Sequence, residues 1–362
     1  MQPVTDGSTQ ATQKGLVQRL DVFACPACRS GLRLDGETLA CAGCGAVYRI
    51  DNGIPLLFHP HSTGDRRDDI TDLVKEFYEK NPFPNYDDFD SAETLAEKAN
   101  KGVFARLLDE QIPQGALLLD AGCGTGQLSN FLGMTWNRLV FGSDLCLNSL
   151  RLAEDFRNRC KIKYAQFVHM NLFRPAFREG LFDVVICNGV LHHTGDPLGG
   201  FRSLARLLKP GGLIIIGLYN RFGRLPTDFR RLLLRVGGNG FRFLDAHMRS
   251  RGYNEARRRA WFMDQYKHPH ESKHSYNEVM EWFEACGFEF LFSIPKIEPG
   301  PFLPDEKLFV AHDKGTKVDR FLTELGMLLR GGADGGLFIM IGRNLKQQEE
   351  AIPITRMGTP VR

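Results

Sequence analysis

A short apolar run that ends in an acid and is followed by closely spaced glycines constrains the fold of this chain most. Leu117-Leu118-Leu119-Asp120 precedes Ala121-Gly122-Cys123-Gly124-Thr125-Gly126. A buried strand that enters a glycine-rich turn and then a helix is the nucleotide-binding geometry of open α/β sheets. Glycines let the backbone of such a turn approach a ligand closely. The segment therefore predicts an α/β fold with a cofactor site at this turn, although any tight strand–helix turn also fits the glycines alone.

The spacing of the motif separates two kinds of cofactor. Dinucleotide sites use G-x-G-x-x-G, whereas this loop is Asp-x-Gly-x-Gly-x-Gly and resembles the first motif of class I S-adenosylmethionine-dependent methyltransferases with a type 11-like core. That cofactor lacks phosphate and carries positive sulfonium and ammonium groups, so an acid beside the loop is useful. The resemblance implies a Rossmann-like seven-stranded sheet with helices on both faces, formed by residues 101–220 and 275–343.

Further landmarks follow in the order that this family requires. Asp144 ends an expected second strand, where the family uses an acid to accept both ribose hydroxyls. Asn171 stands at the adenine edge, where Asp is usual, and its amide oxygen can still accept the adenine amino proton. A fourth strand is expected from Phe182. The resemblance implies these cofactor-binding residues: Asp120, Gly122, Gly124, Gly126, Asp144, Asn171, Leu172 and Asn188.

Four of the nine cysteines form two C-x-x-C pairs, namely Cys25, Cys28, Cys41 and Cys44. Because the N-terminus lacks the apolar core of a secretory signal, these pairs predict metal ligands rather than disulfides. A closed four-sulfur site suits structural Zn²⁺; a rubredoxin-like iron site and a redox dithiol are the alternatives. Together with residues 48–57, residues 20–60 resemble the small zinc-ribbon proteins that partner tRNA and translation-factor methyltransferases, which implies a module that supports a methyltransferase.

The remaining segments flank or interrupt the predicted core. Residues 1–19 are expected to be a flexible N-terminus and 344–362 a C-terminal tail. The aromatic, proline-rich segment 61–100 is expected either to cover the cofactor or to pack on the core as a strap. The insert 221–274 leaves the fifth strand at the sheet edge where ligands bind.

The insert concentrates charge and titratable groups. Residues 221–259 contain eleven arginines, no lysine and three acids, a net charge of +8, although the whole chain carries only +3. Arginines recognise anions, but a solvated helical face is the alternative. His268, His270 and His274 follow, and they are the predicted catalytic residues because histidine can act as a general base. A second metal site or structural contacts are alternatives, and His192 and His193 are secondary candidates.

Composition narrows the function. The chain is 43% apolar and 25% charged, which excludes a disordered or fibrous protein, and no apolar run approaches the length of a membrane span. We expect a cytoplasmic enzyme that transfers a methyl group to an N, O or C nucleophile of a small-molecule acceptor, with an anionic acceptor as one version. Alternatives are a tRNA or rRNA methyltransferase using the zinc ribbon and the arginines, a protein methyltransferase, and a non-catalytic cofactor-binding scaffold.

Overall fold

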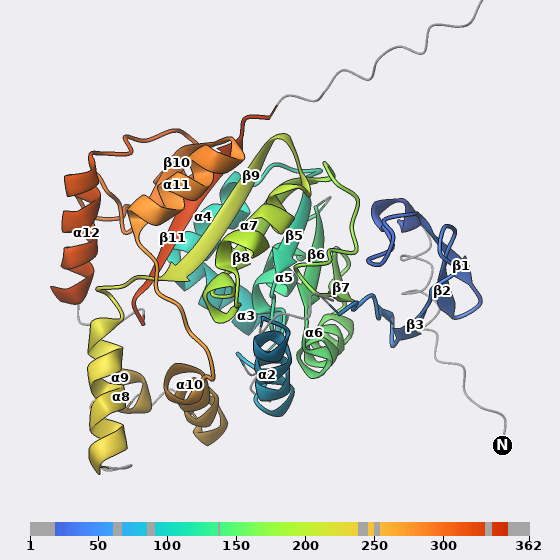
Figure 1. The fold of residues 1–362 in the computed structure, drawn as a ribbon, viewed down its shortest axis with the longest axis horizontal. Coiled ribbons are helices and arrows are strands. Elements are labelled where there is room, and N and C mark those ends of the chain that lie inside the picture. Colours follow the sequence, from blue (N-terminus) through green and yellow to red (C-terminus); the bar gives the residue numbers. More distant parts are fainter. Residues whose placement is uncertain are drawn as a thin grey trace, which may run out of the picture.

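A computed structural model describes residues 19–60, 67–84, 91–136, 138–237, 245–249, 254–329 and 335–346 (Figure 1). Residues 1–18 of the expected flexible N-terminus and 347–362 of the expected tail lie outside the described residues. So do parts of the aromatic linker (61–66 and 85–90) and of the insert (238–244 and 250–253).

A seven-stranded sheet forms the centre of the molecule, in the order β10-β11-β9-β8-β5-β6-β7. Only β11 runs against its neighbours β9 and β10, whereas β5, β6, β7, β8 and β9 pair in parallel. The strands are β5 (Leu117–Ala121), β6 (Leu139–Asp144), β7 (Ala165–His169), β8 (Phe182–Asn188), β9 (Leu208–Tyr219), β10 (Phe288–Ile294) and β11 (Leu337–Asn344). The predicted seven-stranded sheet is confirmed, with its reversed last strand.

Helices cover both faces of the sheet because its central strands bury side chains on both sides. In β5, Leu117 and Leu119 enter one hydrophobic cluster, and Leu118 enters the other. The covering helices are α3 (Ala92–Lys101), α4 (Val103–Gln111), α5 (Gln127–Leu132), α6 (Leu147–Arg159), α7 (Pro197–Ala205) and α11 (Tyr276–Cys286). The helix α12 (Lys317–Leu329) packs beside α11 at the margin of the molecule. This arrangement confirms the Rossmann-like methyltransferase fold.

The N-terminal module, residues 19–60, is a small antiparallel sheet beside β7 (Figure 1). It comprises a 3-10 turn, η1 (Leu20–Val22), and the strands β1 (Leu32–Asp35), β2 (Thr38–Cys41), β3 (Val47–Asp51) and β4 (Ile54–Pro55). Phe23 is fully buried and stacks on Phe177, with ring centroids 5.4 Å apart. Leu56 also forms a parallel β-bridge with His169 at the end of β7. The module therefore shares the hydrophobic core of the large sheet.

Four further helices lie at the carboxyl ends of the parallel strands (Figure 1). They are α2 (Arg67–Lys80), α8 (Leu225–Gly237), α9 (Ala246–Arg249) and α10 (Glu255–Lys267). Glu79 of α2 accepts hydrogen bonds from the backbone N–H groups of Leu147 and Asn148, at 2.9 and 3.3 Å. Since a helix N-terminus favours negative charge, this contact fastens α2 to the start of α6. No helix of the described segments is long and apolar enough to span a bilayer.

Candidate active site

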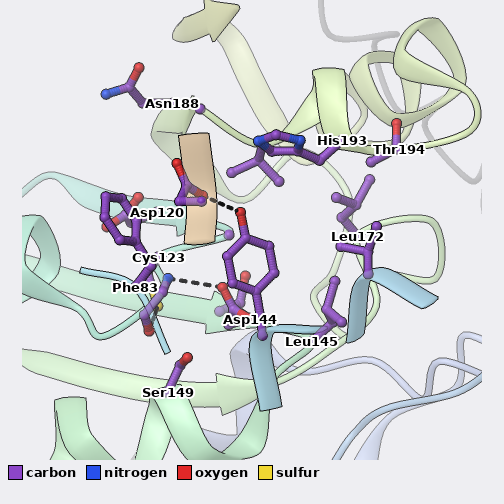
Figure 2. A pocket seen from close by; sticks show the side chains of 18 of the residues that line it. Phe83, Asp120, Cys123, Asp144, Leu145, Ser149, Leu172, Asn188, His193 and Thr194 are labelled. Carbon is purple, nitrogen blue, oxygen red and sulfur yellow. Dashed lines mark hydrogen bonds between the residues drawn. The ribbon is translucent and has the colours of Figure 1, made fainter. Parts of the chain in front are cut away.

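A cavity of about 410 Å³ lies at the carboxyl ends of β5, β6, β8 and β9, beneath α2 and α10. Figure 2 shows it from close by, with Asn188, His193 and Thr194 along one side and Asp144, Leu145 and Ser149 along the other. Open α/β sheets bind ligands at this edge because the loops there come from several strands. The predicted residues Asp120, Gly122, Gly124, Asp144, Asn171, Leu172 and Asn188 all line the cavity.

The glycine loop forms the floor of the cavity, and two of its glycines are sterically required. Gly122 and Gly124 have φ angles of 75° and 55°, a left-handed conformation that disfavours other residues. A Cβ atom on Gly124 would lie 2.3 Å from the carbonyl oxygen of Phe83. The Thr125 hydroxyl also donates to the carbonyl oxygen of Pro84. The loop is therefore in direct contact with the segment that covers it.

Gly126, the last glycine of the predicted motif, has a different role in the structure. Its φ is 73°, and a Cβ atom there would lie 2.6 Å from the Phe167 ring and 2.7 Å from Ala153. It thus permits close packing of α5 behind the loop. Direct contact between Gly126 and the cofactor stays a prediction.

Two buried carboxyl groups flank the loop. Asp144 accepts hydrogen bonds from the backbone N–H groups of Gly124, at 2.9 Å, and Cys146, at 2.8 Å. Asp120 accepts one from the Ser129 hydroxyl at 2.6 Å. Burial raises the pKa of each carboxyl to about 6, because a charged group is costly away from water. The remaining lone pairs of Asp144 can accept further hydrogen bonds from a ligand.

Asn171 holds the position predicted for the adenine edge, but its side chain already has partners. Its Oδ1 accepts from the Phe173 N–H at 3.0 Å, and its Nδ2 donates to the His59 carbonyl at 3.4 Å. The amide thus links the cavity wall to the N-terminal module. Leu145 and Leu172 provide apolar surface on the same side (Figure 2).

Aromatic and acidic side chains from distant segments form the other half of the cavity. Tyr78 of α2 donates to Asp264 of α10 at 2.9 Å, and Gln265 Nε2 donates to the same carboxyl at 2.8 Å. Trp261 and Tyr219 complete this wall. Burial raises the pKa of both Tyr78 and Asp264. Since 186 residues separate Tyr78 from Asp264, no local pattern in the sequence joins them.

His193 has the most defined chemistry of the histidines near the cavity. Its Nδ1 lies 2.9 Å from the carbonyl oxygen of His270. A carbonyl only accepts hydrogen bonds, so Nδ1 carries the proton and Nε2 carries the lone pair of the neutral ring. Burial lowers the pKa of His193 to about 4, which keeps the ring neutral at pH 7. This residue was a secondary candidate in the sequence, where nothing indicated its partner.

The three predicted catalytic histidines lie in different environments. His268 stacks on His193, with ring centroids 3.7 Å apart, and burial lowers its pKa to about 3. His270 contributes its backbone carbonyl. His274 lies between Ser272 Oγ and Glu278 Oε1, each 2.8 Å from a ring nitrogen, outside the lining of the cavity. Their catalytic roles stay predictions, and the geometry favours His193 over His274.

The arginines expected to grip an anionic acceptor include two with internal partners. Arg224 is fully buried and donates to both carboxylate oxygens of Glu271, at 2.8 and 2.6 Å. Arg231 donates to the same carboxylate at 2.8 Å. These pairs lower the pKa of Glu271 to about 2, against the opposing effect of its burial. Arg224 and Arg231 therefore fasten α8 to the segment after α10.

The cysteine pairs of the N-terminal module converge. Cys25, Cys28, Cys41 and Cys44 place their sulfur atoms within 4.8 Å of one another. Cys28 and Cys41 are 3.4 Å apart, and Cys25 and Cys44 are 3.8 Å apart. Zinc–sulfur bonds of about 2.3 Å in a tetrahedron place sulfurs about 3.8 Å apart. The cluster is compatible with a bound metal ion.

Part of the sequence that forms this cavity matches a known protein family. Residues 119–216 match a family model described as a methyltransferase domain. This segment of the chain is thus similar to a methyltransferase domain. The match includes the glycine loop, Asp144 and His193, which contribute to the lining of the cavity. Fold and domain together support binding of S-adenosylmethionine.

Curated proteins of similar sequence cover part of this chain. An uncharacterized protein of Synechococcus sp. is 31% identical over 198 residues, which are 48% of this chain and 47% of that protein. A ubiquinone biosynthesis O-methyltransferase of Marinobacter nauticus is 33% identical over 117 residues, 32% of this chain and 49% of its own. The chain thus spans about half the length of these relatives.

Among solved structures, the magnesium protoporphyrin IX methyltransferase of Synechocystis PCC 6803 with bound SAH is 16% identical. It aligns with a TM-score of 0.41 over 77% of this chain and 95% of its own.

Proposed function

We propose that this chain transfers the methyl group of S-adenosylmethionine to an N, O or C nucleophile of a small-molecule acceptor. The observation that carries the proposal is the continuity of the cavity. The glycine loop and Asp144 line one half, and His193, Tyr78 and Asp264 line the other. A methyl donor and an acceptor can therefore meet within one enclosed space.

The donor set of the first half fits S-adenosylmethionine, which supplies an electrophilic methyl group when bound. The Asp144 carboxylate can accept hydrogen bonds from ribose hydroxyls. Leu145 and Leu172 offer apolar surface for an adenine ring. The backbone of Gly122 and Gly124 follows the edge of the cavity without side chains in the way. The predicted binding roles of Asp120, Asn171 and Asn188 are part of the same proposal.

The residues of the second half can orient an acceptor and take its proton. His193 Nε2 bears a lone pair, and its orientation is fixed by the bond from Nδ1 to the His270 carbonyl. The Tyr78–Asp264 hydrogen bond holds α2 and α10 together over the acceptor, which excludes water and aligns the reacting atoms. A base matters where the acceptor nucleophile still holds its proton.

The lining favours an aromatic or similarly flat acceptor. Tyr78, Tyr219, Trp261 and His193 present ring faces or edges to this half of the cavity, and rings pack well against such surfaces. The ubiquinone biosynthesis O-methyltransferase of Marinobacter nauticus, whose name indicates oxygen methylation of a small molecule, supports this acceptor class. We therefore expect phenolic hydroxyls among the acceptors.

Removal of the His193 imidazole tests the proposal. Transfer of a radiolabelled methyl group from S-adenosylmethionine is measured with a panel of phenols and catechols and, separately, with total RNA. His193→Ala should lower turnover by about 10²–10⁴-fold, the range for loss of a general base. Its affinity for S-adenosylhomocysteine should stay within about twofold, because His193 lies on the acceptor side. His312→Ala is the control, since His312 lies behind β10. Label in RNA alone would contradict a small-molecule acceptor.

We also propose that the four cysteines hold one structural Zn²⁺. All four positions of a tetrahedral site are filled by sulfur, so no position remains for a substrate. Purified protein should contain one zinc per chain, and Cys25→Ser should lose it, whereas Cys160→Ser, outside the cluster, should retain it. Iron in place of zinc, or four freely titratable thiols in the native protein, would contradict this assignment.

A further inference from the structure

Two helices at one margin of the molecule expose an unusual amount of apolar surface. We call this surface the outer face. It comprises nine side chains that are 38–84% exposed: Leu225, Phe229, Leu232 and Val236 of α8, and Val318, Phe321, Leu322, Leu325 and Leu329 of α12. Scattered apolar residues on a surface are ordinary, but a contiguous group marks an interaction site.

Within each helix the exposed apolar residues recur at spacings of three and four, so they form one stripe along the helix. The two stripes also adjoin each other. The Phe222 ring, just before α8, lies 5.5 Å from the Phe321 ring of α12. Figure 1 shows α12 and α8 following each other along the same margin of the molecule. The outer face is therefore extended and nearly continuous.

Helices α8 and α12 are both amphipathic, but their apolar sides face solvent rather than the protein. Surface helices of globular proteins normally turn their apolar side inward. In α12, the inward residues include Arg320 and Glu324, only 7% and 3% exposed. In α8 they include the buried Thr227, and the buried Arg224 lies directly before the helix. Polar and charged groups, together with Met327 of α12, thus hold these helices to the protein, and their apolar stripes face outward.

The outer face adjoins the most basic part of the chain. Residues 221–267 carry eleven arginines and one lysine against four acids, a net charge of +8, so the rest of the chain is net negative. Two of those acids, Asp245 and Asp264, are buried. Arg235, Arg249 and Arg259 are exposed on α8, α9 and α10. Apolar and cationic surface therefore occur together.

We propose that the outer face lies on the surface of an anionic lipid bilayer. Helices that combine a Leu- and Phe-rich stripe with arginines bind at the headgroup boundary, and anionic lipids attract the basic residues. Charge decides against a second copy as the occupant, because a two-fold interface would place two segments of +8 side by side. The inference goes beyond the proposed function and does not depend on the identity of the acceptor.

Vesicle flotation tests the proposal with the full chain. Vesicles of phosphatidylcholine with one third phosphatidylglycerol should bind the protein, and pure phosphatidylcholine vesicles should bind at least tenfold less. The double variant F229S/L232S should lower binding to the anionic vesicles at least tenfold. The control L152S/V47S changes two apolar residues of 40% and 63% exposure elsewhere on the surface, and it should bind like wild type.

Substitution of exposed arginines provides a second test of membrane binding. Each arginine near a membrane surface contributes about fivefold to binding, so R235Q/R249Q/R259Q should weaken it by about two orders of magnitude, and added salt should weaken it further. Equal binding by F229S/L232S and its control would overturn the proposal. So would light scattering that shows a dimer which F229S/L232S dissociates. Unchanged affinity for S-adenosylhomocysteine verifies that each variant is folded.

Discussion

The N-terminal module and residues 220–275 both flank the methyltransferase sheet, but they attach to it in opposite ways. The module inserts the apolar side chains of Phe23 and Leu57 into the main core. The insert contacts the region of the sheet through hydrogen bonds, such as the one from Arg224 to the Gly335 carbonyl. It is tied together internally by the Arg224–Glu271 ion pair, and it exposes the apolar stripe of α8. An apolar attachment makes the module part of the folding unit, whereas a polar attachment leaves the insert to line the half of the cavity that we propose for the acceptor.

The substitution with the largest expected effect removes an apolar contact between the N-terminal module and the large sheet. Phe23→Ala should lower the free energy of unfolding by about 3–5 kcal/mol, the usual cost of removing a buried aromatic ring. Because Phe23 packs against Phe141 and Phe177, the large sheet should lose this stability too. Urea unfolding followed by circular dichroism measures it. Val47→Ala, at an exposed site of the module, is the control, and a loss confined to the module would contradict the shared core.

Breaking the polar attachment should cost nearly as much. Arg224→Ala leaves the Glu271 carboxylate short of its main partner, and disruption of a buried pair costs about 3–5 kcal/mol. Turnover should fall, because Gln265 also loses a hydrogen bond from Arg224, while S-adenosylhomocysteine affinity is retained. Arg235→Ala is the matched control on α8. Equal stability of the two variants would show that the pair is dispensable.

The same pair has a defined pH signature. The pKa of Glu271 is lowered to about 2, so its stabilising contribution is present above the ordinary glutamate pKa and disappears as pH falls toward 2. Arg224→Ala should therefore reduce the difference in stability between pH 6 and pH 3, which thermal unfolding measures.

Replacement of Asp144 should have a smaller effect, limited to binding in the half of the cavity that we propose for the cofactor. Asp144→Asn should weaken binding of S-adenosylhomocysteine by about 1.5–3 kcal/mol, the range for hydrogen bonds to a charged group. Since the pKa of Asp144 is raised to about 6, wild-type affinity should fall as pH decreases from 7 to 5, and the variant should not follow. Calorimetry measures both, with the exposed Asp155→Asn as control. The same pH dependence in the variant would assign it to another group.

Replacement of His274 is expected to have the smallest effect, because this side chain lies outside the lining of the cavity. His274→Ala should lower stability by about 1 kcal/mol per lost hydrogen bond, since Ser272 and Glu278 lose a partner. Turnover should remain within about twofold. A loss of turnover comparable to that of His193→Ala would restore His274 as a catalytic candidate.

Local patterns in the sequence predicted the sheet, and they also indicated the residues of the half of the cavity that we propose for the cofactor. The apolar run before Asp120, the glycine loop and Asp144 are encoded in short segments, and the fourth strand begins at Phe182 as expected. The strand β7 begins at Ala165, where it pairs with Val140 of β6. Strand ends depend on such pairing, which no single segment encodes.

The acceptor half could not be predicted in this way. Tyr78, His193 and Asp264 belong to segments far apart in the chain, and only the packing of α2 and α10 over β8 and β9 brings them together. The tautomer of His193 depends on one backbone carbonyl from the segment after α10. Three histidines within seven residues pointed to the segment after α10, but their spacing gave no orientation of any ring.

The bridge between Leu56 and His169 has a consequence for solubility. β7 is an outermost strand, and an uncovered outermost strand offers its backbone groups to a strand of another molecule. Leu56 and the β4 segment occupy part of that row. At the opposite margin, the His312 N–H donates to the Leu291 carbonyl of β10, at 2.9 Å. Both rims of the sheet are thus at least partly occupied by the chain itself, and deletion of residues 20–60 would leave β7 free to recruit a neighbour and aggregate.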